Sequence, residues 1–335
     1  MYRLAGSLDP DSMHHAAAAT FVEMARSGYG AVGEFHYVHH QPDGSPYEDP
    51  AEMAIAVAEA AVAKALPIVV LPAAYRRAGW DGEDIEPQGP QRRFCDRDVE
   101  TFLERVELIR QWAASRPLVD VGVAAHSVRA VPASWLERIA AYADEKGIVR
   151  HAHASEQRRE LAECRAEHGC SPIALLERTG FLGPRTTVVH GVHVDDEDVH
   201  NLASTSTIVV SCPTTEGNLG DGHFPAPAYR DAGVPIAIGS DSQVRVDPFE
   251  ECRELETGAR RQSETREGLL SAYGDLWARL VANGAASLGV EQEALPRIEL
   301  DLTHPALRGV AHEDLPAAIA TCADAGAVAG RVPVG

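Results

Sequence analysis

Val149-Arg150-His151-Ala152-His153-Ala154-Ser155-Glu156-Gln157 is the stretch of sequence that decides the fold. It begins as a short β-like run after Gly147 and leads into a charged helix that we expect to start at Glu156. Alternate side chains of a strand point to the same face, so His151 and His153 share a face and Glu156 lies just past the strand end. This is the position at which α/β-barrel enzymes keep their chemistry.

The chain on either side of this stretch alternates between apolar strands and helices. Asp9 and Pro10 predict the start of a helix that ends near Gly28, because aspartate caps helices and proline fits their first turn. Apolar runs predict six further strands, at 31–38, 67–71, 118–125, 186–190, 207–212 and 234–241. Such alternation is typical of a parallel sheet covered by helices. With the quoted stretch the series holds seven strands, one fewer than a closed eight-stranded barrel.

The segment from about Arg76 to Asp96 interrupts this pattern. It is rich in glycine and proline and shows no periodicity. Loops of this length are uncommon in compact domains unless they are functional or mobile. A lid over a site and a disordered excursion are the two interpretations that the sequence leaves open.

The charge of the chain excludes some classes of partner. Fifty acidic and thirty basic residues give a formal net charge of −20. This balance argues against nucleic acid and against anionic membranes as partners. A small anionic substrate would need local arginines to overcome the negative field. A homodimer is compatible with the sequence but is not indicated by it.

The cysteines and the apolar runs bear on the compartment. The six cysteines form no C-x-x-C pair and no disulfide-like framework, which suits a reducing cytoplasm. Cys164, His168 and Cys170 lie close together in sequence, and an incidental helix end explains them better than a zinc site. No apolar run reaches the roughly 18 residues of a membrane span, and Met1 does not open a signal peptide. We therefore expect a soluble, cytoplasmic protein.

Polar side chains that suit metal-assisted hydrolysis end four of the expected strands: His126, His153, His190 and Asp241. The carboxyl ends of the strands of a parallel barrel meet at one mouth, so these residues are expected to become neighbours. Imidazole and carboxylate groups bind divalent metals, and Glu156 with His190 could exchange protons near neutral pH. Taken singly, each histidine could be a hydrogen-bonded core residue, and Asp241 could be a turn or N-cap residue.

Two further features lie close to these strand ends. Arg129 follows His126 by three residues, and its planar guanidinium could bind a substrate carboxylate or form a salt bridge at the rim. The glycines and proline of the segment Asn218–Pro225 predict a tight turn near the mouth. Motifs for a nucleophilic serine, a phosphate loop or a dinucleotide are absent from the sequence.

With these motifs the sequence resembles the amidohydrolase superfamily and, within it, the formimidoylglutamate deiminases. The superfamily resemblance rests on His153-x-x-Glu156, His190 and Ser240-Asp241-Ser242. The subgroup resemblance rests on Glu34-Phe-His-Tyr-Val-His-His40, His126-Ser-Val-Arg-Ala130 and Thr215-Glu-Gly-Asn-Leu-Gly-Asp-Gly222. The resemblance covers the chain to about residue 290 and implies an α/β fold, a TIM-like (β/α)8 barrel of the amidohydrolase type.

The resemblance also implies a role for individual residues. His153 and Asp241 correspond to ligands of one divalent metal, Zn²⁺, and His151 does not. Glu156 and His190 correspond to the proton-transfer residues, with Asp241 assisting the deprotonation of water. The residues that correspond to the substrate-binding set are Tyr37, His126 and Arg129.

The sequence departs from the family pattern at both ends. Family members carry a first strand with a His-x-His metal pair, and the resemblance places Met1 downstream of it. We therefore expect the barrel at 1–290 to lack its first strand, and 291–335 to be a reduced part of an accessory β-sandwich. Gln243 stands where the family usually has a histidine. With only His153 and Asp241 as ligands, we expect weak metal binding and low activity from this chain.

The resemblance favours hydrolysis of N-formimidoyl-L-glutamate to N-formyl-L-glutamate and ammonia, a step of histidine degradation. Two alternatives remain open at this stage. The first is a related deaminase that acts on a ring amidine. The second is a truncated, non-catalytic remnant of such an enzyme.

Overall fold

A computed structural model describes residues 2–332 of the chain. Contacts divide the chain into two compact units. Unit 1 comprises Met1–Val22, Ala31–Ala154 and Arg159–Leu182, and unit 2 comprises Glu23–Gly30, Ser155–Arg158 and Gly183–Gly335. This division concerns contacts, and the expected domain boundary at 290/291 stays a prediction.

The main strands of each unit pair in parallel, and each unit also has one short antiparallel pair. The strands of unit 1 are β1 (Val32–His36), β2 (Ile68–Ala74), β3 (Gly79–Trp80), β4 (Asp84–Ile85), β5 (Val119–Val121), β6 (Val123–Ser127) and β7 (Arg150–Ala154). Those of unit 2 are β8 (Thr186–His190), β9 (Ile208–Ser211), β10 (Ile236–Ile238), β11 (Arg297–Leu300) and β12 (Val328–Val332). The strand series is β1-β2-β6-β7 in unit 1 and β8-β9-β10 in unit 2, and all pairs within these two runs are parallel. The expected series of seven strands, and with it the α/β class, is confirmed.

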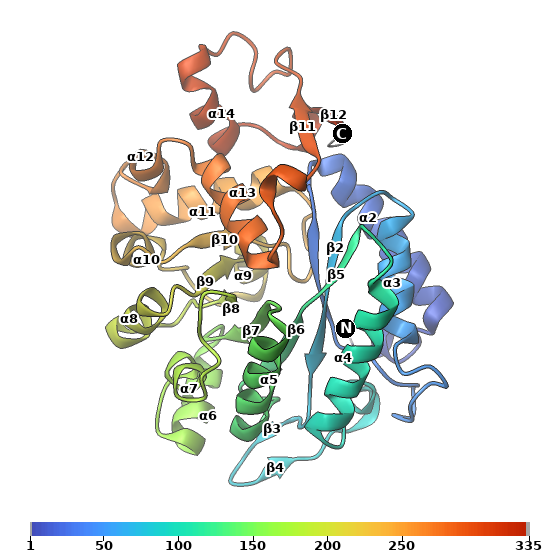
Figure 1. Cartoon of the computed structure of the whole chain (residues 1–335). Coiled ribbons are helices and arrows are strands. Elements are labelled where there is room, and N and C mark those ends of the chain that lie inside the picture. Colours follow the sequence, from blue (N-terminus) through green and yellow to red (C-terminus); the bar gives the residue numbers. More distant parts are fainter. Residues whose placement is uncertain (1, 333–335) are drawn as a thin grey trace. The chain divides into compact units, whose positions relative to one another are not determined.

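Helices follow the strands in both units (Figure 1). The first part of the chain forms α1 (Tyr2–Ala5), α2 (Pro10–Ser27), α3 (Glu52–Val62), η1 (Gly89–Arg93), α4 (Val99–Ala113), α5 (Ala133–Lys146), α6 (Arg158–His168) and α7 (Pro172–Arg178). The rest forms α8 (Asp196–Ser204), α9 (Pro213–Leu219), α10 (Ala226–Ala232), α11 (Pro248–Ser263), α12 (Leu269–Tyr273), α13 (Leu276–Leu288), η2 (Gln292–Ala294), η3 (His312–Asp314), α14 (Leu315–Thr321) and η4 (Ala325–Ala327). None of the helices formed by residues 2–332 combines the length and apolar character needed to cross a bilayer.

The core of unit 1 lies between β2 and the helices α3 and α4, which pack against it. Every residue of β2 is buried, as expected for a central parallel strand that is covered on both faces. The expected strand at 118–125 is divided into β5 and β6 at Gly122. A Cβ atom at this glycine would lie 2.7 Å from side-chain atoms of both Leu71 and Val149, so only glycine allows this close approach.

Two other expectations need correction. The segment 76–96 is an ordered excursion with a β3–β4 hairpin and the 3-10 helix η1, so the disordered interpretation is wrong. The helix after the quoted stretch begins at Arg158, two residues later than expected, and leaves Glu156 in the turn. This turn requires a positive φ of 56° at Ser155, which a helix start at Glu156 would not provide.

The last part of unit 2 packs around its own small core. β11 and β12 pair antiparallel, and Phe249 of α11 is buried with Leu307, Ala323 and Ala327. The stacked ring of Trp277 lies against Phe249 with ring centroids 4.4 Å apart. Residues 297–332 are therefore ordered around α11, although their sequence shows only weak periodicity.

Candidate active site

The predicted site residues fall into two groups, one in each unit. In unit 1, Tyr37, His126 and His153 lie after or within β1, β6 and β7. In unit 2, Glu156 follows β7, His190 ends β8 and Asp241 follows β10. The parallel direction of the strands explains why residues more than a hundred positions apart gather within each group.

The unit 1 group is built from rings. His126 lies between Tyr37 and Tyr75, with ring centroids 5.3 Å and 4.6 Å away, and 5.5 Å from the His153 ring. Phe35 packs on His153 at 4.2 Å. These aromatic contacts fix the orientation of both imidazoles. Sequence reasoning did not identify Phe35 or Tyr75, whose only signal was a position at or near the end of a strand.

One hydrogen bond decides which nitrogen of His153 can act as a ligand. Nδ1 of His153 lies 2.9 Å from the carbonyl oxygen of His126, so this nitrogen carries the proton and donates. The lone pair of Nε2 is then directed away from the bond. Orientation of a ligating histidine through its other nitrogen is the usual arrangement in metal sites.

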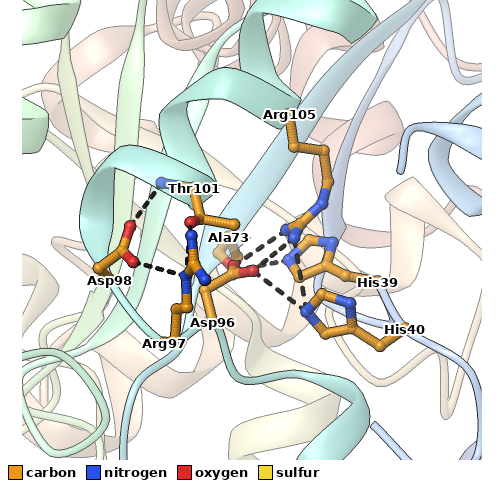
Figure 2. A network of polar contacts seen from close by, with 8 residues as sticks. All are labelled: His39, His40, Ala73, Asp96, Arg97, Asp98, Thr101 and Arg105. Carbon is orange, nitrogen blue, oxygen red and sulfur yellow. Dashed lines mark hydrogen bonds and ion pairs between the residues drawn. The ribbon is translucent and has the colours of Figure 1, made fainter. Parts of the chain in front are cut away.

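A buried network holds the loop that carries Tyr37 (Figure 2). His39 donates through Nε2 to the carbonyl oxygen of Ala73, 3.0 Å away at the end of β2. His40 lies 3.1 Å from Asp96, and Arg105 of α4 donates to both carboxylate oxygens of Asp96. Burial alone would raise the pKa of Asp96, but the hydrogen bonds from His40 and Arg105 outweigh it and hold this pKa well below its usual range. The network ties the segment 76–96 and the Tyr37 loop to the sheet.

Arg129 is placed by its backbone. The fully buried guanidinium of Arg77 donates to the carbonyl oxygen of Arg129 at 3.0 Å and pairs with Glu167 of α6 at 2.7 Å. The Arg129 side chain lines a small cavity with Trp80 of the β3–β4 hairpin and Cys164 of α6. The structure therefore places Arg129 beside the ordered part of the segment 76–96.

The unit 2 group consists of carboxylates around one histidine. Nε2 of His190 lies 3.8 Å from Glu156 and 4.0 Å from Asp241, and Nδ1 lies 3.3 Å from Glu216 of α9. Burial would lower the pKa of His190, but the hydrogen bond to Glu216 and the charges of Glu156, Glu216 and Asp241 outweigh it and raise this pKa to about 9. Such an environment favours a positive charge at or near the imidazole.

Glu216 was quoted within a motif but was not assigned a role. It also accepts hydrogen bonds from the hydroxyl of Ser211 at 2.9 Å and from the backbone N–H of Cys212 at 2.7 Å. These bonds lock Glu216 between β9 and α9 and aim it at His190. The carboxylate thus orients His190 as the His126 carbonyl orients His153.

Backbone strain accompanies this group. Ser155, His190 and Asp241 adopt positive φ angles of 56°, 75° and 41°, although none of them is a glycine. Residues held in such conformations concentrate at functional sites because the surrounding structure must enforce them. The strain coincides with the strand ends that carry the candidate chemistry.

Three of the side chains offer atoms that could bind a metal ion: His153, His190 and Asp241. Two imidazoles and a carboxylate are a suitable donor set for Zn²⁺ in a catalytic site. The excess of carboxylates around His190 is the electrostatic environment that a divalent cation would relieve. The chemistry of His153 and Asp241, the ligand candidates that the sequence indicated, therefore fits such an ion, and the raised pKa of His190 suits it to proton transfer.

The chain is similar to known proteins over most of its length. The model of the Amidohydrolase family matches residues 2–292. The chain is 36% identical over 299 residues to a formimidoylglutamate deiminase of Pseudomonas aeruginosa, covering 86% of this chain and 64% of that protein. It is 29% identical to a 5-methylthioadenosine/S-adenosylhomocysteine deaminase of Haloarcula marismortui, covering 85% of this chain and 60% of that protein. The chain thus spans somewhat less than two thirds of both relatives.

A solved structure agrees with the fold of the whole chain. The crystal structure of an amidohydrolase from Brucella melitensis superposes with a TM-score of 0.89 at 29% sequence identity. The match covers 100% of this chain and 77% of that chain. The barrel-type α/β fold expected from the sequence is therefore confirmed.

Proposed function

This chain belongs to the amidohydrolase family, and we propose that it is a metal-dependent deiminase that hydrolyses N-formimidoyl-L-glutamate to N-formyl-L-glutamate and ammonia. The proposal rests on the position of His190, which lies between the carboxylates of Glu156, Asp241 and Glu216. The formimidoylglutamate deiminase relative supports the choice of substrate.

Different residues of the chain would bind the metal ion and transfer protons. His153 and Asp241 would hold one Zn²⁺ ion, which as a Lewis acid makes water more acidic. Glu156 and Asp241 would accept the proton of the attacking water. The new C–O bond forms as the C–N bond breaks, and Glu156 with His190 would deliver protons to the departing nitrogen. Glu216 would hold His190 in position throughout.

Binding of the substrate is the second part of the proposal. Arg129 would hold a carboxylate of the glutamate portion, because a guanidinium fork matches a carboxylate. Tyr37 and His126 would contact the rest of the substrate from the ring group. The substrate would be a small anionic amino-acid derivative, as the sequence predicts. A cytoplasmic location and a homodimer stay part of this proposal.

Metal content and ammonia release test the proposal together. The full chain, equilibrated with Zn²⁺, should bind zinc weakly and release ammonia slowly from N-formimidoyl-L-glutamate, as expected for His153 and Asp241 as the ligands. His153→Ala should lose both properties. His200→Ala is the matched control, because His200 is an exposed histidine of α8 and should leave both unchanged. Equal zinc content in wild type and His153→Ala would contradict the assignment of His153.

Deamination of a ring amidine is the second candidate function, supported by the nucleoside-deaminase relative. Arg129→Met discriminates the two. Loss of a charge-assisted contact should lower kcat/KM for N-formimidoyl-L-glutamate by about 10- to 100-fold. A neutral ring substrate such as 5-methylthioadenosine should be unaffected. Unchanged kinetics with formimidoylglutamate would refute the carboxylate-anchor role.

A further inference from the structure

Asp221, in the loop between α9 and α10, is a buried acidic residue to which the proposed mechanism assigns no role. Its side chain is 94% buried, since it keeps only 6% exposure. One oxygen, Oδ1, accepts a hydrogen bond from Nε2 of Gln157 at 3.0 Å. The other oxygen, Oδ2, is fully buried and has no hydrogen-bond partner among the residues that the structure describes.

The loop leaves Asp221 little freedom. Its backbone N–H donates to the carbonyl oxygen of Glu216 at 3.0 Å, closing the end of α9. At Gly222, φ is +129°, and a Cβ atom there would lie 3.3 Å from both His193 and Val192. The loop is thus packed closely on the chain just after His190, and it carries Asp221 at a fixed place in the unit 2 group.

Asp221 belongs electrostatically to the acidic group. Burial raises its pKa, the bond from Gln157 lowers it, and the charges of Glu156 and Glu216 raise it while His190 lowers it. Four carboxylates, those of Glu156, Glu216, Asp221 and Asp241, therefore surround one histidine.

A buried carboxylate oxygen without a donor is costly, by about 1–3 kcal/mol or more for a charged group. Such a group is kept where a ligand supplies the missing donor. The ligand must be a hydrogen-bond donor, and the neighbouring carboxylates of Glu156 and Glu216 favour a cation. An acyclic amidine is protonated at neutral pH and carries N–H groups in the plane of its C–N bonds. Its shape and charge match a single carboxylate oxygen.

We infer that Asp221 is a specificity-determining residue that binds the protonated amidine of the substrate through Oδ2. The inference rests on the proposed function and adds the part of the substrate that the arginine does not contact. Asp221 discriminates the substrate from the product, because hydrolysis converts the amidinium into a neutral amide with the same two carboxylates. Loss of the cationic donor then weakens the contact and favours release of the product.

The test is a set of binding titrations on the full chain by calorimetry. Every protein compared also carries Glu156→Gln, so that the formimidoyl compound is bound and not hydrolysed, and wild type here means wild type at Asp221 and Gln157. The probes are N-formimidoyl-L-glutamate, N-formyl-L-glutamate and formamidinium chloride. Wild type should bind the formimidoyl compound about 10- to 100-fold more tightly than the formyl compound, the range expected for one charge-assisted hydrogen bond. Asp221→Asn keeps the acceptor for Gln157 and removes the charge, so it should abolish this preference and the binding of formamidinium. Its affinity for the formyl compound should change little.

Gln157→Leu is the matched control. It removes the hydrogen bond to Asp221 and keeps the charge, so it should retain the preference for the formimidoyl compound. A preference that survives in Asp221→Asn would overturn the inference and leave the proposed function intact. Equal affinity of wild type for the two glutamate compounds would also overturn it, even if Asp221→Asn failed to fold.

The formamidinium titration separates this inference from the proposed function. If neither glutamate compound binds, but formamidinium binds wild type and not Asp221→Asn, the proposed substrate is wrong and amidinium recognition stands. If wild type binds none of the three probes, both are overturned.

Discussion

Charge is compensated in one buried polar group of the molecule and left uncompensated in another. In unit 1, Asp96 is paired with Arg105 through both oxygens and with His40 through one (Figure 2). In unit 2, His190 faces an excess of carboxylates, and one oxygen of Asp221 has no hydrogen-bond donor among the described residues. The charge of Asp96 is therefore compensated by its partners, whereas the carboxylates around His190 outnumber the cationic groups.

This difference separates structure from function. Buried charges contribute to a fold only when partners compensate for the lost hydration, and the Asp96 group meets this condition. The His190 group leaves negative charge uncompensated and adds backbone strain at Ser155 and Asp241. Such an imbalance opposes folding and is explained by ligands that bind there. Mutations should therefore affect stability in one group and activity in the other.

The largest expected effect is on catalysis by the unit 2 group. Glu156→Gln keeps the size of the side chain and removes its ability to accept and deliver protons. We expect ammonia release from N-formimidoyl-L-glutamate to fall by about 100-fold or more. Urea unfolding should show no loss of stability, because the change removes one charge from a crowded acidic group. Wild-type turnover in Glu156→Gln would contradict the catalytic role assigned to the unit 2 group.

The next effect is on stability and concerns the unit 1 group. Asp96→Ala leaves Arg105 buried without its carboxylate, and removal of one partner of a buried pair costs about 3–5 kcal/mol. The midpoint of urea unfolding should shift accordingly. A cost below about 1 kcal/mol would show that the pairing of Asp96 does not determine its contribution. Loss of activity at full stability would instead place this network in the reaction.

The sequence predicted the parts of this comparison that depend on periodicity. Apolar runs identified the seven strands, and the parallel direction implied that polar residues at their ends would gather. His190 and Asp241 were found in this way. The break between β5 and β6 at Gly122 was not predicted. A side chain at this position would collide with Leu71 and Val149, and these residues are distant in sequence.

The sequence could not predict the features of the site and of the fold that depend on which side chains are buried. Glu216 and Asp221 lie in a segment whose glycines indicate a turn, and nothing in the sequence tells which carboxylates face inward. The β3–β4 hairpin was missed because strands of two residues carry no periodic signal. The pairing of Asp96 with Arg105 likewise required the coordinates.

Glu34 of β1 is a carboxylate in unit 1 whose ionised form is destabilised by burial, so it provides a further test of the difference between the two groups. Burial raises its pKa from 4.5 to about 7. The folded protein therefore binds this proton more tightly than the unfolded chain, and stability should fall as pH rises from 4.5 through 7. Glu34→Gln should remove this fall and raise stability at pH 8 by about 1–3 kcal/mol. Thermal unfolding at pH 4.5 and pH 8 would show a gain only at the higher pH, and an equal gain at both would refute the assignment.

The smallest effect is expected two residues from Asp96. Asp98 caps α4 by accepting the backbone N–H of Thr101 at 2.8 Å and contacts the exposed Arg97 (Figure 2). Asp98→Ala removes a cap and a screened surface ion pair, so it should lower the midpoint of urea unfolding only slightly. Asp98→Asn keeps a capping oxygen and should cost less. Asp96 and Asp98 have the same chemistry, so a severalfold smaller cost at Asp98 follows from the burial and pairing of Asp96. Equal costs for Asp96→Ala and Asp98→Ala would mean that the buried network contributes no more than a helix cap.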